Sequence, residues 1–273
     1  MNNNDFTLLG VDFECSACKK LKNQAYSIPV ARIIQKLDSF FDTNDLSGAV
    51  SLLEYWQDEA YSIGDLSGEL SVVNEMLGLY RKTSSKEKAE KSILRSLELI
   101  DLTNSGNSIS GATIILNAAT TCKAFGNAEK AISLYERATE IYKNQGLSHD
   151  DLRYAALYNN YATALVDLRR FEKAKDLYDK AVALTEKSIT SLLDCAVTYV
   201  NMAHLYEAWQ GFDSEHIEYY LSSAEDILKN QEIERNAYYA FVCEKCAPSF
   251  DYFGHFILAQ ELRDASRKIY AGA

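Results

Sequence analysis

Residues 155–184 read AALYNNYATALVDLRRFEKAKDLYDKAVAL, and the spacing of their apolar side chains decides the fold class. Apolar or small residues recur every three or four positions, with a break near Arg169-Arg170. These residues are Tyr158, Tyr161, Ala162, Leu165, Phe171, Ala174, Leu177, Tyr178, Ala181 and Leu184. Such spacing is typical of amphipathic helices. The stretch therefore predicts two helices joined by a short turn, and the small side chains of Ala162, Ala174 and Ala181 would let them approach closely.

The same scheme recurs along the chain at a steady interval. The residues that open the apolar face of each second helix are Ala49, Ala89, Ala131, Ala174, Ile217 and Ala259. Successive members of this set lie 40, 42, 43, 43 and 42 residues apart. A period this regular predicts a solenoid of six helical hairpins, in which each hairpin buries its apolar face only against its neighbours. Gly126-Asn127 is the predicted turn of the third hairpin.

Three short segments carry the pattern most clearly: LYERA at 134–138, GLSHDD at 146–151 and NNYA at 159–162. Their large, small and aromatic residues at fixed helical positions resemble the tetratricopeptide repeat family, over about residues 30–270. A tetratricopeptide repeat usually has about 34 residues, and the longer repeats of this chain are similar to those of kinesin light chain and of bacterial peptide-sensing regulators. The resemblance implies an all-α fold, an α-solenoid wound into a right-handed superhelix, with a concave groove for a protein or peptide ligand.

The ends of the array are less regular than its centre. We expect the repeats to span residues 29–273, with residues 1–28 as an N-terminal extension, and Pro29 to open the first helix. Pro248 falls within the first helix of the last repeat, where its missing N–H should kink or end that helix.

Composition excludes several classes of function. The 273 residues are 47% hydrophobic, contain two prolines and carry a net charge of −11. An acidic surface argues against nucleic acid and anionic membranes, and any charged partner is expected to be basic. The start of the chain lacks a basic leader and no apolar run approaches the roughly 18 residues of a membrane span, which predicts a cytoplasmic protein. Six cysteines in so long a chain are expected to be reduced thiols.

The sequence offers little support for a catalytic or metal-binding site. The sequence has no phosphate-binding loop, no H-E-x-x-H zinc motif and no G-x-S-x-G elbow, so neither catalysis nor a cofactor is expected. Cys15 and Cys18 together with Cys243 and Cys246 have the paired spacing of a four-thiolate zinc site. The two pairs are far apart in the array and the second pair lies at core positions, so buried thiols are the favoured interpretation. His149 precedes a helix start, where Ser148 with Asp151 is interpreted as a capping box rather than a metal ligand set.

A row of amides is the candidate binding site. Asn117, Asn160 and Asn201 recur at the same position of three successive first helices, and asparagine is a poor helix former. A carboxamide carries both a donor and an acceptor and can hold the N–H and C=O of an extended peptide. In the resembling families, asparagines at matching places grip a peptide main chain. Other candidate peptide-binding residues on the same helices are Asn74, Lys123, Thr163 and His204. The alternative is that these amides bond to the neighbouring helix and only fix the stacking of hairpins.

Three functions stay open at the level of sequence. The first is a scaffold or adaptor that binds an extended peptide or a partner helix in its concave groove. The second is a peptide-sensing regulatory protein of the bacterial type, although residues 1–28 are too short for a DNA-binding module. The third, disfavoured by the absent motifs, is an enzyme.

Overall fold

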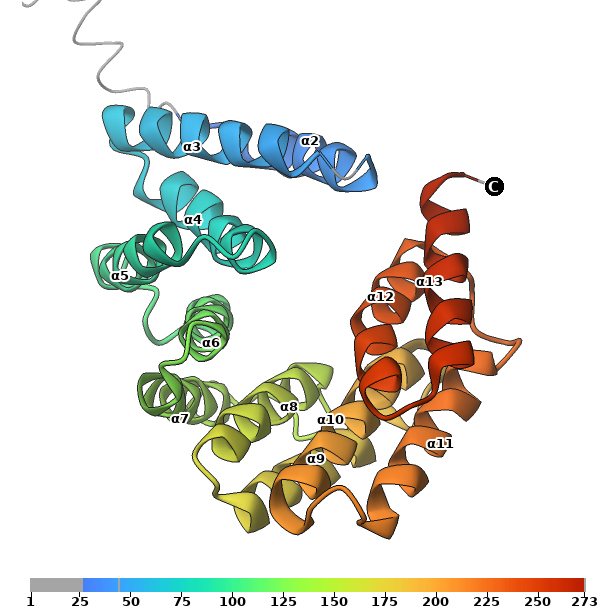
Figure 1. The fold of residues 1–273 in the computed structure, drawn as a ribbon. Coiled ribbons are helices and arrows are strands. Elements are labelled where there is room, and N and C mark those ends of the chain that lie inside the picture. The colour runs from blue at the N-terminus through green and yellow to red at the C-terminus, as the bar shows by residue number, and fades with distance from the viewer. Residues whose placement is uncertain (1–26, 44, 273) are drawn as a thin grey trace, which may run out of the picture.

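The computed structural model describes residues 27–43 and 45–272, and this part of the chain contains twelve α-helices and no strand. Consecutive helices form six antiparallel hairpins (Figure 1). The hairpins are α2 (Val30–Asp42) with α3 (Leu46–Ile63), α4 (Leu66–Lys82) with α5 (Lys86–Leu102), α6 (Ile109–Ala124) with α7 (Ala128–Asn144), α8 (Leu152–Asp167) with α9 (Phe171–Thr185), α10 (Leu192–Gln210) with α11 (Glu215–Lys229), and α12 (Ala237–Tyr252) with α13 (Phe256–Tyr270). A short 3₁₀ turn, Ile189–Ser191, precedes α10.

The predicted hairpin pattern is confirmed. All six residues that open the second helices are buried, and five of them, all alanines, have no exposed surface. The turn at Arg169-Arg170 separates α8 from α9, and Arg169 adopts a positive φ of 57° there. Gly126, with a φ of 85°, occupies the corresponding turn between α6 and α7. A left-handed residue in each turn ends the first helix and sends the chain back along it.

The starts of α3 and α4 share a feature that the repeat pattern did not predict. Both begin with the tetrapeptide DLSG, at 45–48 and 65–68, and in each the aspartate caps the helix by accepting from the glycine N–H. A Cβ on Gly68 would lie 2.2 Å from the Asp65 carboxylate and 2.6 Å from Ile28. Only glycine therefore leaves room for this cap.

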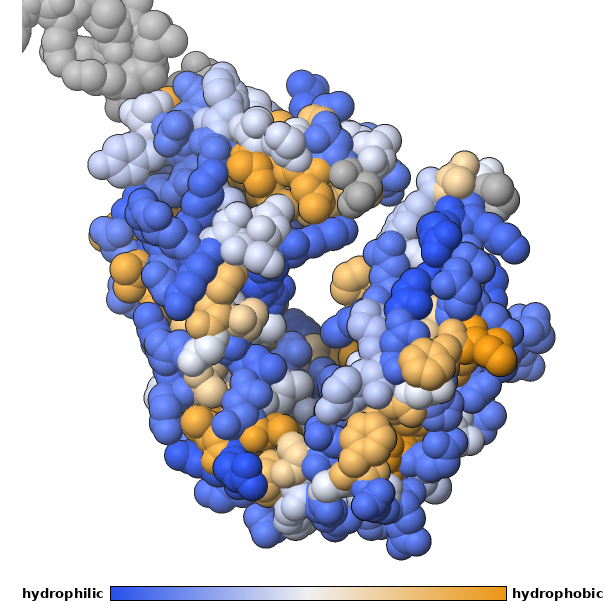
Figure 2. Space-filling model, in the orientation of Figure 1, coloured by the Kyte–Doolittle hydropathy of each residue, from blue (hydrophilic) through white to orange (hydrophobic). Residues whose placement is uncertain are grey.

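The hairpins stack into a curved array with two rows of helices (Figure 1). The first helices α4, α6, α8, α10 and α12 form the inner row, in which each packs against the next. The second helices lie on the outside of the curve. One continuous core runs through all six hairpins, with fully buried tyrosines such as Tyr135, Tyr142 and Tyr178. The array curves far enough that α12 faces the first two hairpins across a central hollow (Figure 2).

Two local expectations are wrong. Pro248 does not end its helix, because α12 continues to Tyr252. Pro248 is exposed, and its neighbours Ala247 and Phe250 are buried. Packing of this buried face therefore keeps the helix intact although Pro248 has no N–H to donate to the preceding turn. Ser148 does not cap α8 either. Asp151 is the cap, accepting from the N–H of Arg153, and Ser148 only accepts from Asp151 through its backbone carbonyl.

The described cysteines are core residues. Cys122, Cys195, Cys243 and Cys246 are all buried free thiols, as predicted for the last two from their positions. Cys15 and Cys18 lie outside the described residues. Within the described residues, no group of three His, Cys, Asp or Glu side chains is placed to hold a metal ion. None of the described helices is both long enough and apolar enough to cross a membrane.

Candidate functional site: the concave face

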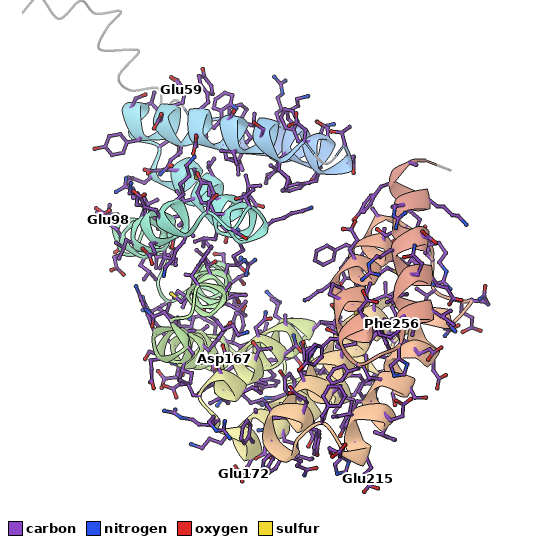
Figure 3. All side chains as sticks on the ribbon, viewed as in Figure 1. Glu59, Glu98, Asp167, Glu172, Glu215 and Phe256 are labelled. Carbon is purple, nitrogen blue, oxygen red and sulfur yellow. The ribbon has the colours of Figure 1, made fainter. Side chains whose placement is uncertain are left out.

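The two faces of the array present different kinds of polar side chain. Glu98 on α5, Glu172 on α9 and Glu215 at the start of α11 point outward from the second helices (Figure 3). The inner row presents amides, hydroxyls and a few charged groups instead. The outer surface is thus rich in charged side chains, whereas the inner row also offers uncharged amides.

Two of the predicted amides pair with amides of the preceding first helix. Asn117 on α6 donates through Nδ2 to Oδ1 of Asn74 on α4, at 2.8 Å. Asn201 on α10 donates in the same way to Asn159 on α8, at 3.0 Å. Both bonds join neighbouring hairpins, as expected from the alternative in which the amides fix the stacking of one hairpin on the next. Each pair still leaves the Oδ1 atom of Asn117 or Asn201 without a hydrogen bond to the rest of the described chain.

Asn160, the third predicted amide, is placed differently. Its half-buried side chain makes no hydrogen bond with any of the described residues, and Asn159, one position earlier, takes the cross-helix bond. Asn160 lines a hollow of about 120 Å³ between α8, α10 and α12, together with Ala156, Thr198 and Lys245. The row of three amides is thus two structural pairs with one open amide between them.

The remaining candidates also lie on the inner row. Lys123 on α6 forms an ion pair with Asp167 on α8, at 3.6 Å, and Thr163 donates to the carbonyl of Asn160 within α8, at 2.7 Å. His204 on α10 lies 2.9 Å from the hydroxyl of Ser249 on α12. Burial lowers the pKa of His204, against the opposing charge of Glu207, so the ring is held in its neutral form. The Lys123–Asp167 and His204–Ser249 contacts each link two successive first helices, whereas the Thr163 bond stays within α8.

A larger hollow lies where the two ends of the array face each other, and the repeat pattern did not predict it. Its volume is about 780 Å³, and its walls come from α2, α4, α12 and α13. The lining includes the rings of Phe41, Phe241 and Tyr270 and the cationic groups of Arg81 and Lys245. Lys245 also lines the hollow beside Asn160, so the two hollows adjoin on the concave face.

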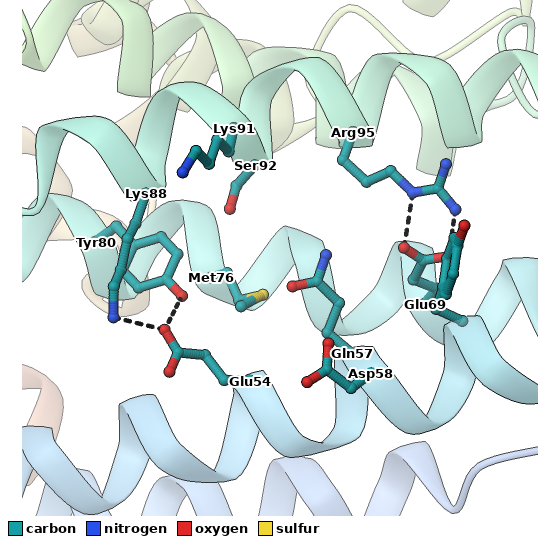
Figure 4. Close-up of a pocket in the computed structure, with 11 residues that line it drawn as sticks. Glu54, Gln57, Asp58, Glu69, Met76, Tyr80, Lys88, Lys91, Ser92 and Arg95 are labelled. Atoms are coloured by element: carbon teal, nitrogen blue, oxygen red, sulfur yellow. Dashed lines mark hydrogen bonds and ion pairs between the residues drawn. The ribbon is translucent and has the colours of Figure 1, made fainter.

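A third hollow, of about 530 Å³, lies between α3, α4 and α5 (Figure 4). Its charged groups are mainly paired with each other. Glu69 accepts two hydrogen bonds from Arg95, and Glu54 accepts from Lys88 at 2.6 Å and from Tyr80 at 3.0 Å. The hydrogen bond from Lys88 is the main cause of the lowered pKa of Glu54. The pairs Glu69–Arg95 and Glu54–Lys88 therefore join the first two hairpins across this cleft.

Comparisons with known proteins agree with the repeat pattern. Two sequence profiles, each described as Tetratricopeptide repeat, match residues 75–144 and 155–188. No curated protein matches the chain in sequence. In structure, the chain is similar to BtubC (BKLC) from P. vanneervenii, with a TM-score of 0.51 and 20% identity over 85% of this chain and 91% of that one.

A second similar structure is a variant of the nearly identical TPR-like repeats assigned to a kinesin light chain of Podosopora anserina. The TM-score is 0.50 with 17% identity, over 74% of this chain and 95% of that one. Identities this low show a shared fold. The profile matches fall on the second to fourth hairpins, from within α4 to just beyond α9. The chain therefore contains tetratricopeptide repeats at residues 75–144 and 155–188, and its described residues form an all-α solenoid of helical hairpins.

Proposed function

We propose that this protein is a non-catalytic scaffold that holds an extended segment of a partner protein in its concave groove. Tetratricopeptide repeats are in general protein-interaction modules, and a solenoid presents a long concave surface to a ligand. The groove of this chain adds two adjoining hollows on its inner row, both lined by Lys245. An extended segment lying along the inner row would pass both hollows.

The observation that carries the proposal is the open amide of Asn160. A half-buried carboxamide with no partner among the described residues has a donor and an acceptor to offer. A peptide backbone presents the matching acceptor and donor at every residue other than proline. Asn117 and Asn201 support the site in a second way, because their bonds to Asn74 and Asn159 hold the inner helices in register.

Replacing Asn160 by alanine is therefore expected to weaken partner binding about tenfold with little change in stability, because up to two hydrogen bonds to the ligand are lost. Asn117→Ala is expected to do the reverse and lower the free energy of unfolding by about 1 kcal/mol, because it removes the bond to Asn74 between α4 and α6. A partner recovered from lysate of the source organism and then purified would serve for calorimetric titration, and urea unfolding would report stability.

Asn144→Ala is the matched control, since Asn144 is an exposed amide at the end of the outer helix α7. It should change neither binding nor unfolding. If Asn160→Ala binds the partner as tightly as the Asn144 control does, the groove amide has no part in recognition and the proposal loses its main support.

A further inference from the structure

The hollow between the two ends of the array brings together cations from distant parts of the sequence. Arg81 lies in the last turn of α4, and Lys245 lies in the middle of α12. Both line the hollow of about 780 Å³. Figure 2 shows it as an opening between the N-terminal and C-terminal hairpins. In an acidic chain, this is a place where positive charge gathers on the concave face.

Neither of these two cations has an ion-pair or hydrogen-bond partner in the part of the chain that the structure describes. Elsewhere on the described surface, lysines and arginines commonly pair with carboxylates, as Lys88 does with Glu54 and Lys123 does with Asp167. Asp42 and Glu244 also line the hollow but form no ion pair with Arg81 or Lys245. The concave face thus contains two positive charges that nothing in the described fold neutralises directly.

Arg81 is half-buried at this hollow, whereas Lys245 remains partly open to solvent. Burial lowers the pKa of Arg81. Burial also lowers the pKa of Lys245, and the charge of Arg81 adds to that effect against the opposing influence of Cys246 and Asp194. A cation that is partly desolvated and faces another cation is stabilised most by an anion placed between them. The rings of Phe41, Phe241 and Tyr270 line the same hollow and would reduce the amount of water around such a contact.

We propose that Arg81 and Lys245 form a subsite for one acidic group of the bound segment, held between the second and the sixth hairpins. This inference rests on the proposed binding of a protein segment in the groove. An acidic side chain or a phosphorylated residue could enter, since both present oxygens that accept charge-assisted hydrogen bonds from guanidinium and ammonium groups. The net charge of −11 favours a basic partner as a whole, whereas this one position would select the opposite charge.

The test uses the immobilised full-length chain and four pools of synthetic 13-residue peptides. The pools are random except at the central position, which is glutamate, phosphoserine, glutamine or lysine. Glutamate or phosphoserine pools are expected to be retained about tenfold more than the glutamine pool, and the lysine pool least. The difference should shrink as salt is raised from 0.05 to 0.5 M, because the contact is partly electrostatic. The better retained of the two acidic pools identifies the anion as a carboxylate or a phosphate.

Variants separate this subsite from the groove as a whole. Arg81→Gln and Lys245→Gln should each remove most of the preference for the acidic pools while the glutamine pool is retained as before. Lys180→Gln is the matched control, because Lys180 is exposed on the outer helix α9 and carries the same charge. Retention of all four pools to the same extent would overturn the acidic subsite but leave groove binding standing. Retention of none of the pools would overturn both the groove proposal and the subsite.

Discussion

Replacing Arg95 by alanine is expected to lower the free energy of unfolding by about 3 kcal/mol. Glu69 on α4 has an exposure of 1%, and its carboxylate is held by Nε of Arg95 at 2.7 Å and by Nη2 at 2.6 Å (Figure 4). Removing one partner of a buried pair leaves the other charge desolvated without compensation. We place the effect at the lower end of the usual range because the Arg95 side chain is 20% exposed, so water can partly replace it.

Lys91→Ala on the same helix provides the control. Lys91 pairs with Glu87 in full contact with solvent, and the loss of this pair should leave the urea midpoint essentially unchanged. Replacing both Glu69 and Arg95 by methionine should recover much of the stability lost in Arg95→Ala, because no buried charge is left. Urea unfolding combined with hydrogen exchange in α4 and α5 would measure these effects. If Arg95→Ala and Lys91→Ala unfold at the same urea concentration, the buried ion pair does not stabilise the second hairpin.

The second large effect is expected at the crossing of α8 and α9. Ala174 has no exposed surface and opens the packing face of α9. A leucine at this position adds three carbon atoms where two helices meet, and the fold can accommodate them only by separating the helices. We expect Ala174→Leu to cost about 3 kcal/mol, at the upper end of the usual range for overpacking.

Ala183→Leu tests whether that cost comes from the helix crossing. Ala183 lies on the same helix but is exposed, and leucine is also a good helix former, so stability should hardly change. Thermal unfolding followed by circular dichroism would compare the two variants. Equal melting temperatures would show that the repeat does not need a small residue at this crossing.

The architecture was predictable because it depends on local periodicity. Ala131 and Ala174 mark helix crossings that depend only on residues nearby in the sequence, and both are fully buried. The sequence predicted that Pro248 would kink or end its helix, and the second of these is wrong: the buried side of α12 at Ala247 and Phe250 outweighs one missing hydrogen bond, so the helix continues.

The site was predictable only in part. The sequence pattern placed Asn117, Asn160 and Asn201 on the inner row, but it could not tell which amides would pair. Which amides pair depends on how each helix is rotated about its axis relative to the next. In this structure Asn201 bonds to Asn159, one residue before the expected Asn160. The proximity of Arg81 and Lys245 was not visible either, because it results from the curvature accumulated over five successive hairpins.

The position of the partner on the concave face can be measured directly by site-specific photo-crosslinking. Benzoylphenylalanine would replace Ala156, which is exposed and lines the hollow beside Asn160, or Ala183, which is exposed on the outer helix α9. After irradiation in lysate of the source organism, adducts would be identified by mass spectrometry. We expect one discrete partner to be crosslinked from position 156 and not from position 183. Crosslinking of the same partner from position 183 alone would place binding on the outer face and rule out binding in the concave groove.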